Sequence, residues 1–162
     1  MRKKLGVGVL AAIMLTVASV TLASASSSPS PDPASTDKTR TIKLVAKHRQ
    51  ETQVDLGEKG FGPGDLIVLS DVLFRHGKRV GTSGVTCTVI FVSSNQQTVQ
   101  LQCVGTLSLP DGQITLQGLP NIAESFALAI TGGTGAYRTA HGQANIFTLS
   151  DKADEYTLQL IL

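Results

Sequence analysis

The sequence predicts an all-β domain, either a sandwich or a barrel, and two observations support this fold class. Segments rich in β-branched residues and poor in proline recur at short spacing, with turn-forming residues between them. No long stretch repeats its apolar residues every three or four positions, as an amphipathic helix would. The candidate strands are Thr41–Thr52, Asp65–Phe74, Gly84–Val92, Thr98–Leu109, Gln113–Gln117, Ser125–Thr131, Arg138–Leu149 and Glu155–Leu162.

Turn residues mark most of the connections between these strands. They are Gly62–Gly64, His76-Gly77, Ser93–Asn95, Pro110–Gly112 and Gly132–Gly135. The last of these could instead be a phosphate-binding loop. We disfavour that interpretation because no Lys-Ser/Thr follows the glycines and no helical pattern begins there.

Alternation of apolar and polar residues predicts which side of a strand is buried. In the strand Thr98–Leu109, Leu101, Cys103 and Leu107 share one face, and glutamines and hydroxyl residues occupy the other. The last strand places Leu158 on its apolar face. A period of two in both segments indicates strands with one face in the core and one in water.

The N-terminus has the order of a secretory signal peptide. Arg2–Lys4 is cationic, Leu5–Leu22 is mainly apolar, and Ala23–Ala25 offers small residues for cleavage after Ala25. We therefore expect a secreted protein with a signal peptide at 1–25, a Ser/Pro-rich flexible linker at 26–40 and a folded domain at 41–162. The alternative is an uncleaved membrane anchor, for which the apolar stretch is near the lower limit of length.

Charge gives no indication of a nucleic-acid partner. The chain has 14 Lys and Arg, of which three lie in the expected signal peptide, leaving 11 against 12 Asp and Glu. The exported part is thus almost neutral, and the cluster Lys43, Lys47 and Arg49 is small enough to be a solvated strand face.

Cys87 and Cys103 are the two cysteines of the chain, and they are equally far along the chain from Asn95, at the centre of a predicted hairpin turn. Opposed residues of an antiparallel hairpin are placed symmetrically about its turn, so the two thiols should face each other. In an exported protein this predicts a disulfide, with a contribution of ~3 kcal/mol to stability. A reactive or metal-binding pair is the alternative, but no His or Asp stands at ligand spacing, so we expect no metal site.

Three stretches together resemble a known superfamily. They are Gly64–Asp71, Gly77–Ile90 and the run from Asp111 to Gly118, which precedes Thr131-Gly-Gly-Thr-Gly-Ala-Tyr-Arg138 and His141-Gly142. This order is similar to the allene oxide cyclase barrel-like and dirigent-like superfamily, and most similar to its exported bacterial, actinobacterial-type members. The resemblance covers residues 41–162 and implies a single small antiparallel eight-stranded β-barrel.

The chain departs from the polar residues of the plant members. Their first-strand Glu and Asn correspond to positions near Val45–His48, where neither residue type is present, and their second-strand Asn corresponds to Asp71. His141 falls where dirigent proteins resemble one another in an Arg. We therefore assign neither the jasmonate-precursor reaction of plant cyclases nor lignan coupling.

Three residues are candidates for catalysis. By likeness to the family pocket, Asp71 would be a general base or cation stabiliser, and His141 and Tyr137 would face inward as acid/base and hydrogen-bond donor. The same likeness places Thr139, Gln143 and Asn145 on that inner face. Each candidate has a structural alternative: Asp71 could end a strand or pair with Arg79, His141 could be a solvated rim residue, and Tyr137 a core aromatic. We expect His48 and His76 to be exposed.

Two functions of different classes are compatible with these residues. The first is a cofactor-independent cyclase or isomerase of a linear, hydrophobic, unsaturated substrate such as an oxidised lipid or polyketide, with pericyclic cyclisation as one form of the reaction. The second is a secreted, non-catalytic, dirigent-like barrel that binds an apolar small molecule. In either case we expect no cofactor. The residues expected to contact the ligand are Leu69, Leu101, Phe126 and Leu158.

Expected partners follow from the same resemblance. We expect a hydrophobic small molecule, no nucleic acid, a membrane only if the signal segment is uncleaved, and a homo-oligomer, either a dimer or a trimer. The second face of some strands supplies apolar residues for such an interface, namely Val68, Ile90, Val104 and Ile161.

Overall fold

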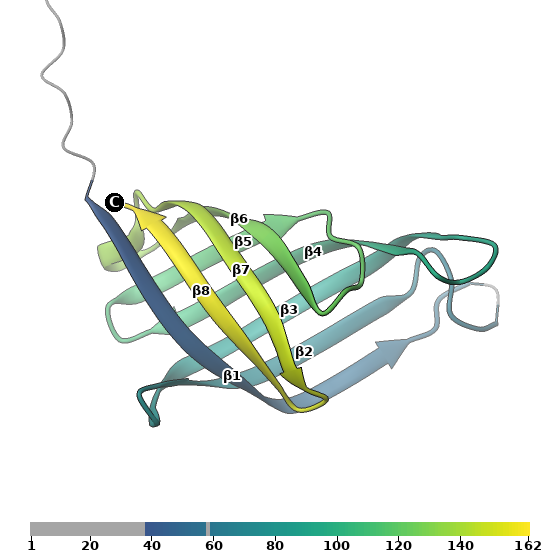
Figure 1. Ribbon diagram of the computed structural model, residues 1–162, viewed down its shortest axis with the longest axis horizontal. Coiled ribbons are helices and arrows are strands. Elements are labelled where there is room, and N and C mark those ends of the chain that lie inside the picture. The colour runs from purple at the N-terminus through teal and green to yellow at the C-terminus, as the bar shows by residue number, and fades with distance from the viewer. Residues whose placement is uncertain (1–37, 58) are drawn as a thin grey trace, which may run out of the picture. The chain divides into compact units, whose positions relative to one another are not determined.

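The computed structural model describes residues 38–57 and 59–162, which form an antiparallel β-domain (Figure 1). The expected signal peptide at 1–25 and most of the linker at 26–40 lie outside the described residues. In the described part, no helix has the length and apolarity needed to cross a membrane. The elements are β1 (Thr39–Val54), β2 (Leu66–Arg75), β3 (Lys78–Val92), β4 (Val99–Leu109), β5 (Gly112–Gly118), β6 (Ser125–Gly133), the 3-10 helix η1 (Gly135–Tyr137), β7 (His141–Ser150) and β8 (Ala153–Ile161).

Each strand pairs with its neighbour in the chain, and β8 pairs back onto β1, so the eight strands form a closed barrel. This confirms the fold predicted from the sequence. Within the described residues, the strand pairing lies between Thr39 and Ile161, and the buried hydrophobic core comes from the same segment. The barrel therefore closes around a core of its own.

Two strands begin three or more residues away from their predicted starts, each for a local reason. β3 begins at Lys78, directly after His76 and Gly77, which both have positive φ, at 50° and 74°. Such a two-residue turn continues the sheet without interruption. β7 begins only at His141 because η1 and a turn bond from Ala140 N–H to the Tyr137 carbonyl occupy the preceding residues.

The glycines of the β6–β7 connection are needed for close backbone contact. A Cβ on Gly133 would lie 2.0 Å from the Gln113 carbonyl oxygen, and Gly135 has a φ of 59°. The predicted role of this segment as a barrel corner is consistent with both observations.

Inward positions follow the predicted alternation in β4 and β8. Leu101, Cys103 and Leu107 are buried in β4, and Leu158 is fully buried in β8. Together with the other inward aliphatic residues they fill the middle of the barrel.

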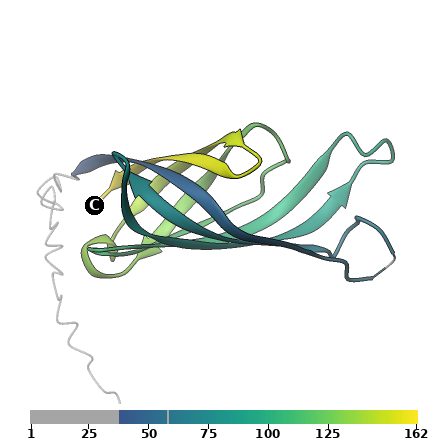
Figure 2. The same cartoon turned by 90° about the horizontal axis from the view of Figure 1, so that it is seen from below.

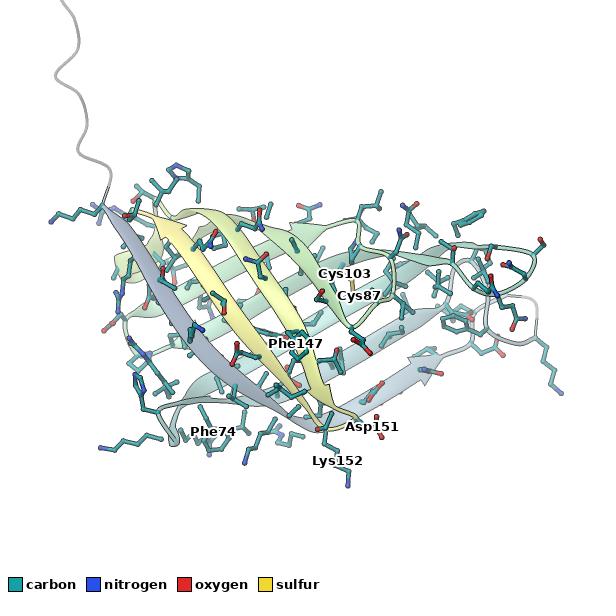
Figure 3. The ribbon with its side chains drawn as sticks, viewed as in Figure 1. Phe74, Cys87, Cys103, Phe147, Asp151 and Lys152 are labelled. Atoms are coloured by element: carbon teal, nitrogen blue, oxygen red, sulfur yellow. A yellow bond between two sulfur atoms is a disulfide. The ribbon has the colours of Figure 1, made fainter. Side chains whose placement is uncertain are left out.

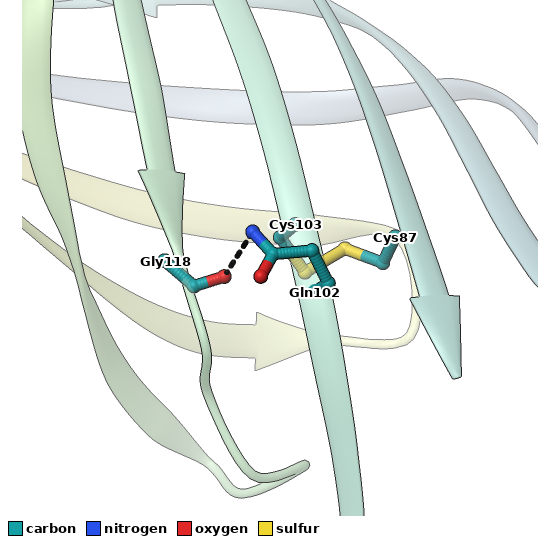
Figure 4. Close-up of a disulfide and its surroundings, with 4 residues drawn as sticks. All are labelled: Cys87, Gln102, Cys103 and Gly118. Carbon is teal, nitrogen blue, oxygen red and sulfur yellow. Dashed lines mark hydrogen bonds between the residues drawn. A yellow bond between two sulfur atoms is a disulfide. The ribbon is translucent and has the colours of Figure 1, made fainter. Parts of the chain in front are cut away.

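The predicted disulfide joins Cys87 of β3 to Cys103 of β4 (Figure 4). The two residues are direct register partners, so the symmetry argument about the hairpin turn was correct. Both side chains face the interior. On the same part of β4, the Gln102 side-chain amide donates a hydrogen bond of 3.2 Å to the Gly118 carbonyl of β5.

The barrel has two ends, which Figure 2 shows from the side. We call the mouth the end formed by the β1–β2, β3–β4, β5–β6 and β7–β8 connections. The far end is formed by the start of β1, the C-terminus, and the β2–β3, β4–β5 and β6–β7 connections.

Candidate functional site

A cavity of about 370 Å³ opens at the mouth, which is within the usual range for small-molecule sites. We call it the mouth cavity. Its lining is apolar on the side of Ile67, Leu69 and the disulfide, and acidic on the side of the β7–β8 turn, where Asp151 is labelled in Figure 3. The lining residues are His48, Glu51, Ile67, Leu69, Cys87, Leu101, Cys103, Pro120, Asn121, Ile122, Ala123, Phe126, Thr148, Ser150, Asp151 and Asp154.

Three of the four residues expected to contact a ligand, Leu69, Leu101 and Phe126, line this cavity. Leu158 does not, because it is fully buried in the packed middle of the barrel. The filled middle of the barrel therefore forms the floor of the mouth cavity.

A row of hydrogen-bonded side chains crosses three strands beside the cavity. His48, Asp71 and Ser83 are consecutive register partners on β1, β2 and β3, so their side chains point to the same inner face. His48 Nδ1 lies 2.9 Å from Asp71 Oδ1, and the Ser83 hydroxyl donates to Asp71 Oδ2 over 2.7 Å. Asp71 is 1% exposed, and both of its carboxyl oxygens are engaged.

A β-bulge follows His48 on β1. His48 itself points inward because it continues the alternation of the buried residues Ile42, Leu44 and Ala46. The pairing of β1 with β2 shifts between His48 and Gln50, which leaves Arg49 unpaired and exposed. The bulge changes the alternation beyond it, so that Glu51, the register partner of Leu69, also lines the cavity. The His48 backbone N–H donates to the Lys152 carbonyl in the β7–β8 turn, at 2.9 Å.

Asp154 of β8 completes the polar wall from the other side of His48. Its Oδ2 lies 3.7 Å from His48 Nε2, close enough for an ion pair when the imidazole is protonated. Burial raises the pKa of Asp154, while His48 and a hydrogen bond from Thr148 oppose that rise. A carboxyl group shifted in this direction keeps its proton to higher pH and is suited to general acid catalysis.

Tyr156 lies two residues further along the inner face of β8 and is buried. Burial, followed by the negative charges of Asp71 and Asp154, raises the pKa of the Tyr156 hydroxyl. The phenol therefore stays neutral at physiological pH and can donate a hydrogen bond.

The structure separates the three predicted catalytic residues. Asp71 is in the polar row at the mouth, whereas Tyr137 is buried in η1 at the far end. His141 is exposed on the outside of β7, with its Nδ1 3.2 Å from the Thr139 carbonyl. The three residues therefore do not form one site.

The expectation that Thr139, His141, Gln143 and Asn145 share the inner face with Tyr137 was wrong. The inward positions of β7 are instead occupied by small and apolar residues, among them Ala144 and Ile146, both buried. The alternation was extrapolated from Tyr137, but a period of two holds only while the chain is extended. The turn at η1 interrupts this alternation, so a new alternation begins with β7.

Two further expectations are corrected. His48, expected to be exposed, has a side chain that is only 13% exposed and is bonded to Asp71. The partners of Asp71 are His48 and Ser83 rather than Arg79. Asp154 and Tyr156 were not predicted as site residues, although the alternation of the last strand indicates that both side chains point inward.

None of these groups forms a recognisable metal centre. Within residues 38–57 and 59–162, no three His, Cys, Asp or Glu side chains are grouped so that they could hold a metal ion. The chemistry available in the described site is that of one imidazole, four carboxyl groups, three hydroxyl groups and a phenol. They belong to His48, to Glu51, Asp71, Asp151 and Asp154, to Ser83, Thr148 and Ser150, and to Tyr156.

Comparison with known proteins agrees with this architecture. The family model "Allene oxide cyclase barrel like domain" matches residues 43–162. A search of curated protein sequences finds no significant match. Among solved structures, a pyocyanin demethylase is similar at 31% identity with a TM-score of 0.69, over 75% of this chain and 99% of that one.

Two more distant structures share the fold. The pterocarpan synthase dirigent protein PsPTS1 has 22% identity and a TM-score of 0.60, over 76% of this chain and 95% of that one. AbnU, an exo-specific intermolecular Diels-Alderase, has 15% identity and a TM-score of 0.63, over 76% and 98%. With the family model matching most of the described barrel, this chain belongs to the allene oxide cyclase barrel-like family.

Proposed function

We propose that the barrel is a cofactor-independent cyclase or isomerase that acts by acid–base catalysis on a hydrophobic, unsaturated small molecule in the mouth cavity. The observation that carries this proposal is the His48–Asp71 pair at the wall of an otherwise largely apolar cavity. An imidazole held by a buried carboxylate and facing a ligand site is an arrangement suited to proton transfer.

Asp71 would orient the base. With an ionised Asp71, the 2.9 Å contact requires that His48 Nδ1 carries a proton and donates it to Asp71 Oδ1. Nε2 is then unprotonated and available to accept a proton from a carbon next to a conjugated system. The positive charge that develops on the imidazole is stabilised by Asp71, which loses no hydrogen bond in the process.

Asp154 would return a proton to the substrate. Its raised pKa and its position 3.7 Å from His48 Nε2 support a carboxylic acid that protonates another atom of the same conjugated system. His48 then passes its proton to Asp154, and the site is restored. The exchange is balanced, because one proton leaves the substrate, one enters, and no electrons are gained or lost.

The cavity would contribute by folding the substrate. Apolar walls of Ile67, Leu69 and Phe126 bind a flexible chain in a compact conformer, which brings its reacting atoms together for ring closure. A linear oxidised lipid or polyketide fits this description. The structural relatives support small-molecule substrates more broadly, since they include a pyocyanin demethylase and a Diels-Alderase.

Replacing His48 by Gln tests the proposal. We expect H48Q to lower the rate of isomerisation or cyclisation by about 10²–10⁴-fold, the usual contribution of a positioned acid or base. Candidate substrates are conjugated polyene acids, with products identified by mass spectrometry and chromatography. H141Q is the matched control, because His141 is exposed on the outer surface.

Equal turnover by H48Q and H141Q would refute the proposal. A wild-type protein that binds these compounds, with no turnover, would instead support the non-catalytic, dirigent-like alternative.

A further inference from the structure

The near-neutral charge of residues 26–162 conceals two oppositely charged ends. Among the residues that the structure describes, the far end carries six cationic side chains and one acidic side chain, Asp111. The cations are Lys38, Arg40, Arg75, Lys78, Arg79 and Arg138. Within the described part of the chain, none of the six has a carboxylate partner within ion-pair distance.

The mouth has the opposite balance. Its acidic residues outnumber its three cations, Arg49, Lys59 and Lys152. The acidic residues are Glu51, Asp55, Asp65, Glu124, Asp151 and Asp154. The barrel therefore has a charge dipole along its axis, with the proposed reaction site at the negative end.

The far end also has a small hollow of about 120 Å³ between Arg40 and Arg75, and Asp111 is the one acidic residue in its lining. Both side chains are partly buried, and apolar residues such as Ile42 and Leu109 line the hollow beneath them. Guanidinium groups bind phosphate oxygens in a bidentate manner, and partial burial strengthens such contacts. Cations above apolar walls fit an amphiphile with an anionic head better than a free ion.

We propose that the far end docks onto the surface of an anionic lipid bilayer, with a headgroup phosphate in the hollow between Arg40 and Arg75. β1 starts at this end, so the polypeptide that leads back to the apolar run Leu5–Leu22 joins the barrel there. Each cation near such a surface strengthens binding about fivefold. The same field repels the acidic mouth, so docking leaves the mouth cavity open to solution.

Vesicle flotation with the chain lacking Met1–Ala25, the form expected after export, tests this docking. We expect binding to phosphatidylglycerol–phosphatidylcholine vesicles but not to phosphatidylcholine alone, and a loss of binding as salt is raised. The double variant K78E/R79E should bind on the order of a hundredfold more weakly, since two attractions become repulsions. R40Q/R75Q tests the hollow and should weaken binding more than tenfold.

The matched control is K59E/K152E, which changes the net charge by the same amount at the mouth. It should bind within a fewfold of the wild type, and circular dichroism checks that all variants are folded. The proposal is overturned if this control loses as much affinity as K78E/R79E, or if the wild type does not prefer anionic vesicles.

Two competitors separate lipid from other anions. Displacement by inorganic phosphate at matched ionic strength would assign the hollow to a soluble phosphate compound and overturn the docking. Equal affinity for duplex DNA would show a general polyanion surface and would also overturn it. Retention on vesicles against both competitors supports the lipid assignment.

Discussion

The same three strands carry opposite kinds of residue at the two ends of the barrel. Toward the mouth, the inward positions of β1, β2 and β8 are His48, Asp71 and Asp154. Toward the far end, they are aliphatic and buried, as at Ile42 and Leu160. Buried ionisable groups lower stability unless they are paired, whereas buried aliphatic groups raise it. The inward residues at the mouth are therefore suited to chemistry, and those in the rest of the interior stabilise the fold.

Truncating a far-end core residue should have the largest effect on stability. We expect L160A to lower the free energy of unfolding by about 2–5 kcal/mol, because the lost methyl groups leave a cavity in a closed barrel. Urea denaturation measures this change. Turnover per folded molecule should be unaffected. D71N should instead lower turnover and change the free energy of unfolding less than L160A does. If L160A abolished turnover in folded protein, the two ends would not be separable in function.

Removing the disulfide should have a similar or smaller effect, centred on the mouth. The double variant C87A/C103A should lower the free energy of unfolding by ~3 kcal/mol, because the cross-link restricts the unfolded chain. Since both cysteines line the mouth cavity, ligand affinity should fall as well. Urea denaturation and ligand titration, compared with reduced wild type, measure the two effects. Unchanged ligand binding in the folded variant would contradict a role for the disulfide in shaping the cavity.

The smallest expected effect is a pH dependence that comes from Asp154. Its pKa is raised in the folded state, so, as pH rises above the ordinary pKa of an Asp carboxyl group, the unfolded chain releases this proton before the folded protein does. The contribution of Asp154 to stability therefore falls as pH rises through this window. D154N cannot lose a proton and should gain stability relative to wild type over the same window.

Urea denaturation of both proteins from acid to neutral pH measures this difference, and E155Q on the adjacent position of β8 is the control. A difference between wild type and D154N that does not depend on pH would contradict the raised pKa. A difference of the opposite slope would indicate that the ion pair with His48 dominates over burial.

Turn residues and alternation along single strands predicted much of the fold. They did not predict contacts between strands that are far apart in the sequence. The Cys87–Cys103 pairing was predictable because a short hairpin loop joins β3 to β4, so the two cysteines meet even with a bulge between Val89 and Phe91. The contact of His48 with Asp71 was not, since a much longer loop joins β1 to β2 and a bulge follows His48 as well. Asp154 reaches His48 only through closure of β8 onto β1, which no local pattern encodes.

The predictions of side-chain orientation and of charge distribution failed for related reasons. His141 was placed inward because alternation was carried across a segment that is not extended. The net charge of the chain is an average over both ends, so it gave no indication that cations and carboxylates are segregated. The segregation of these charges depends on which turns lie at the same end of the barrel, and this is known only once the strand topology is known.

Closure of the sheet also limits how copies of the chain can meet. Each strand has a neighbour on both sides along most of its length, and the end of β1 at Gln50–Val54 pairs with β2 alone, so the finished barrel offers another strand only a short edge there. Most of the surface open to self-association is therefore the outer face of the strands, where Val68, Ile90 and Val104 are exposed. The seam pairs Thr39 with Ile161, from opposite ends of the chain. Before β1 and β8 have paired along this seam, each of them presents an unpaired strand edge. This unclosed form is therefore the one that can aggregate by pairing with other chains.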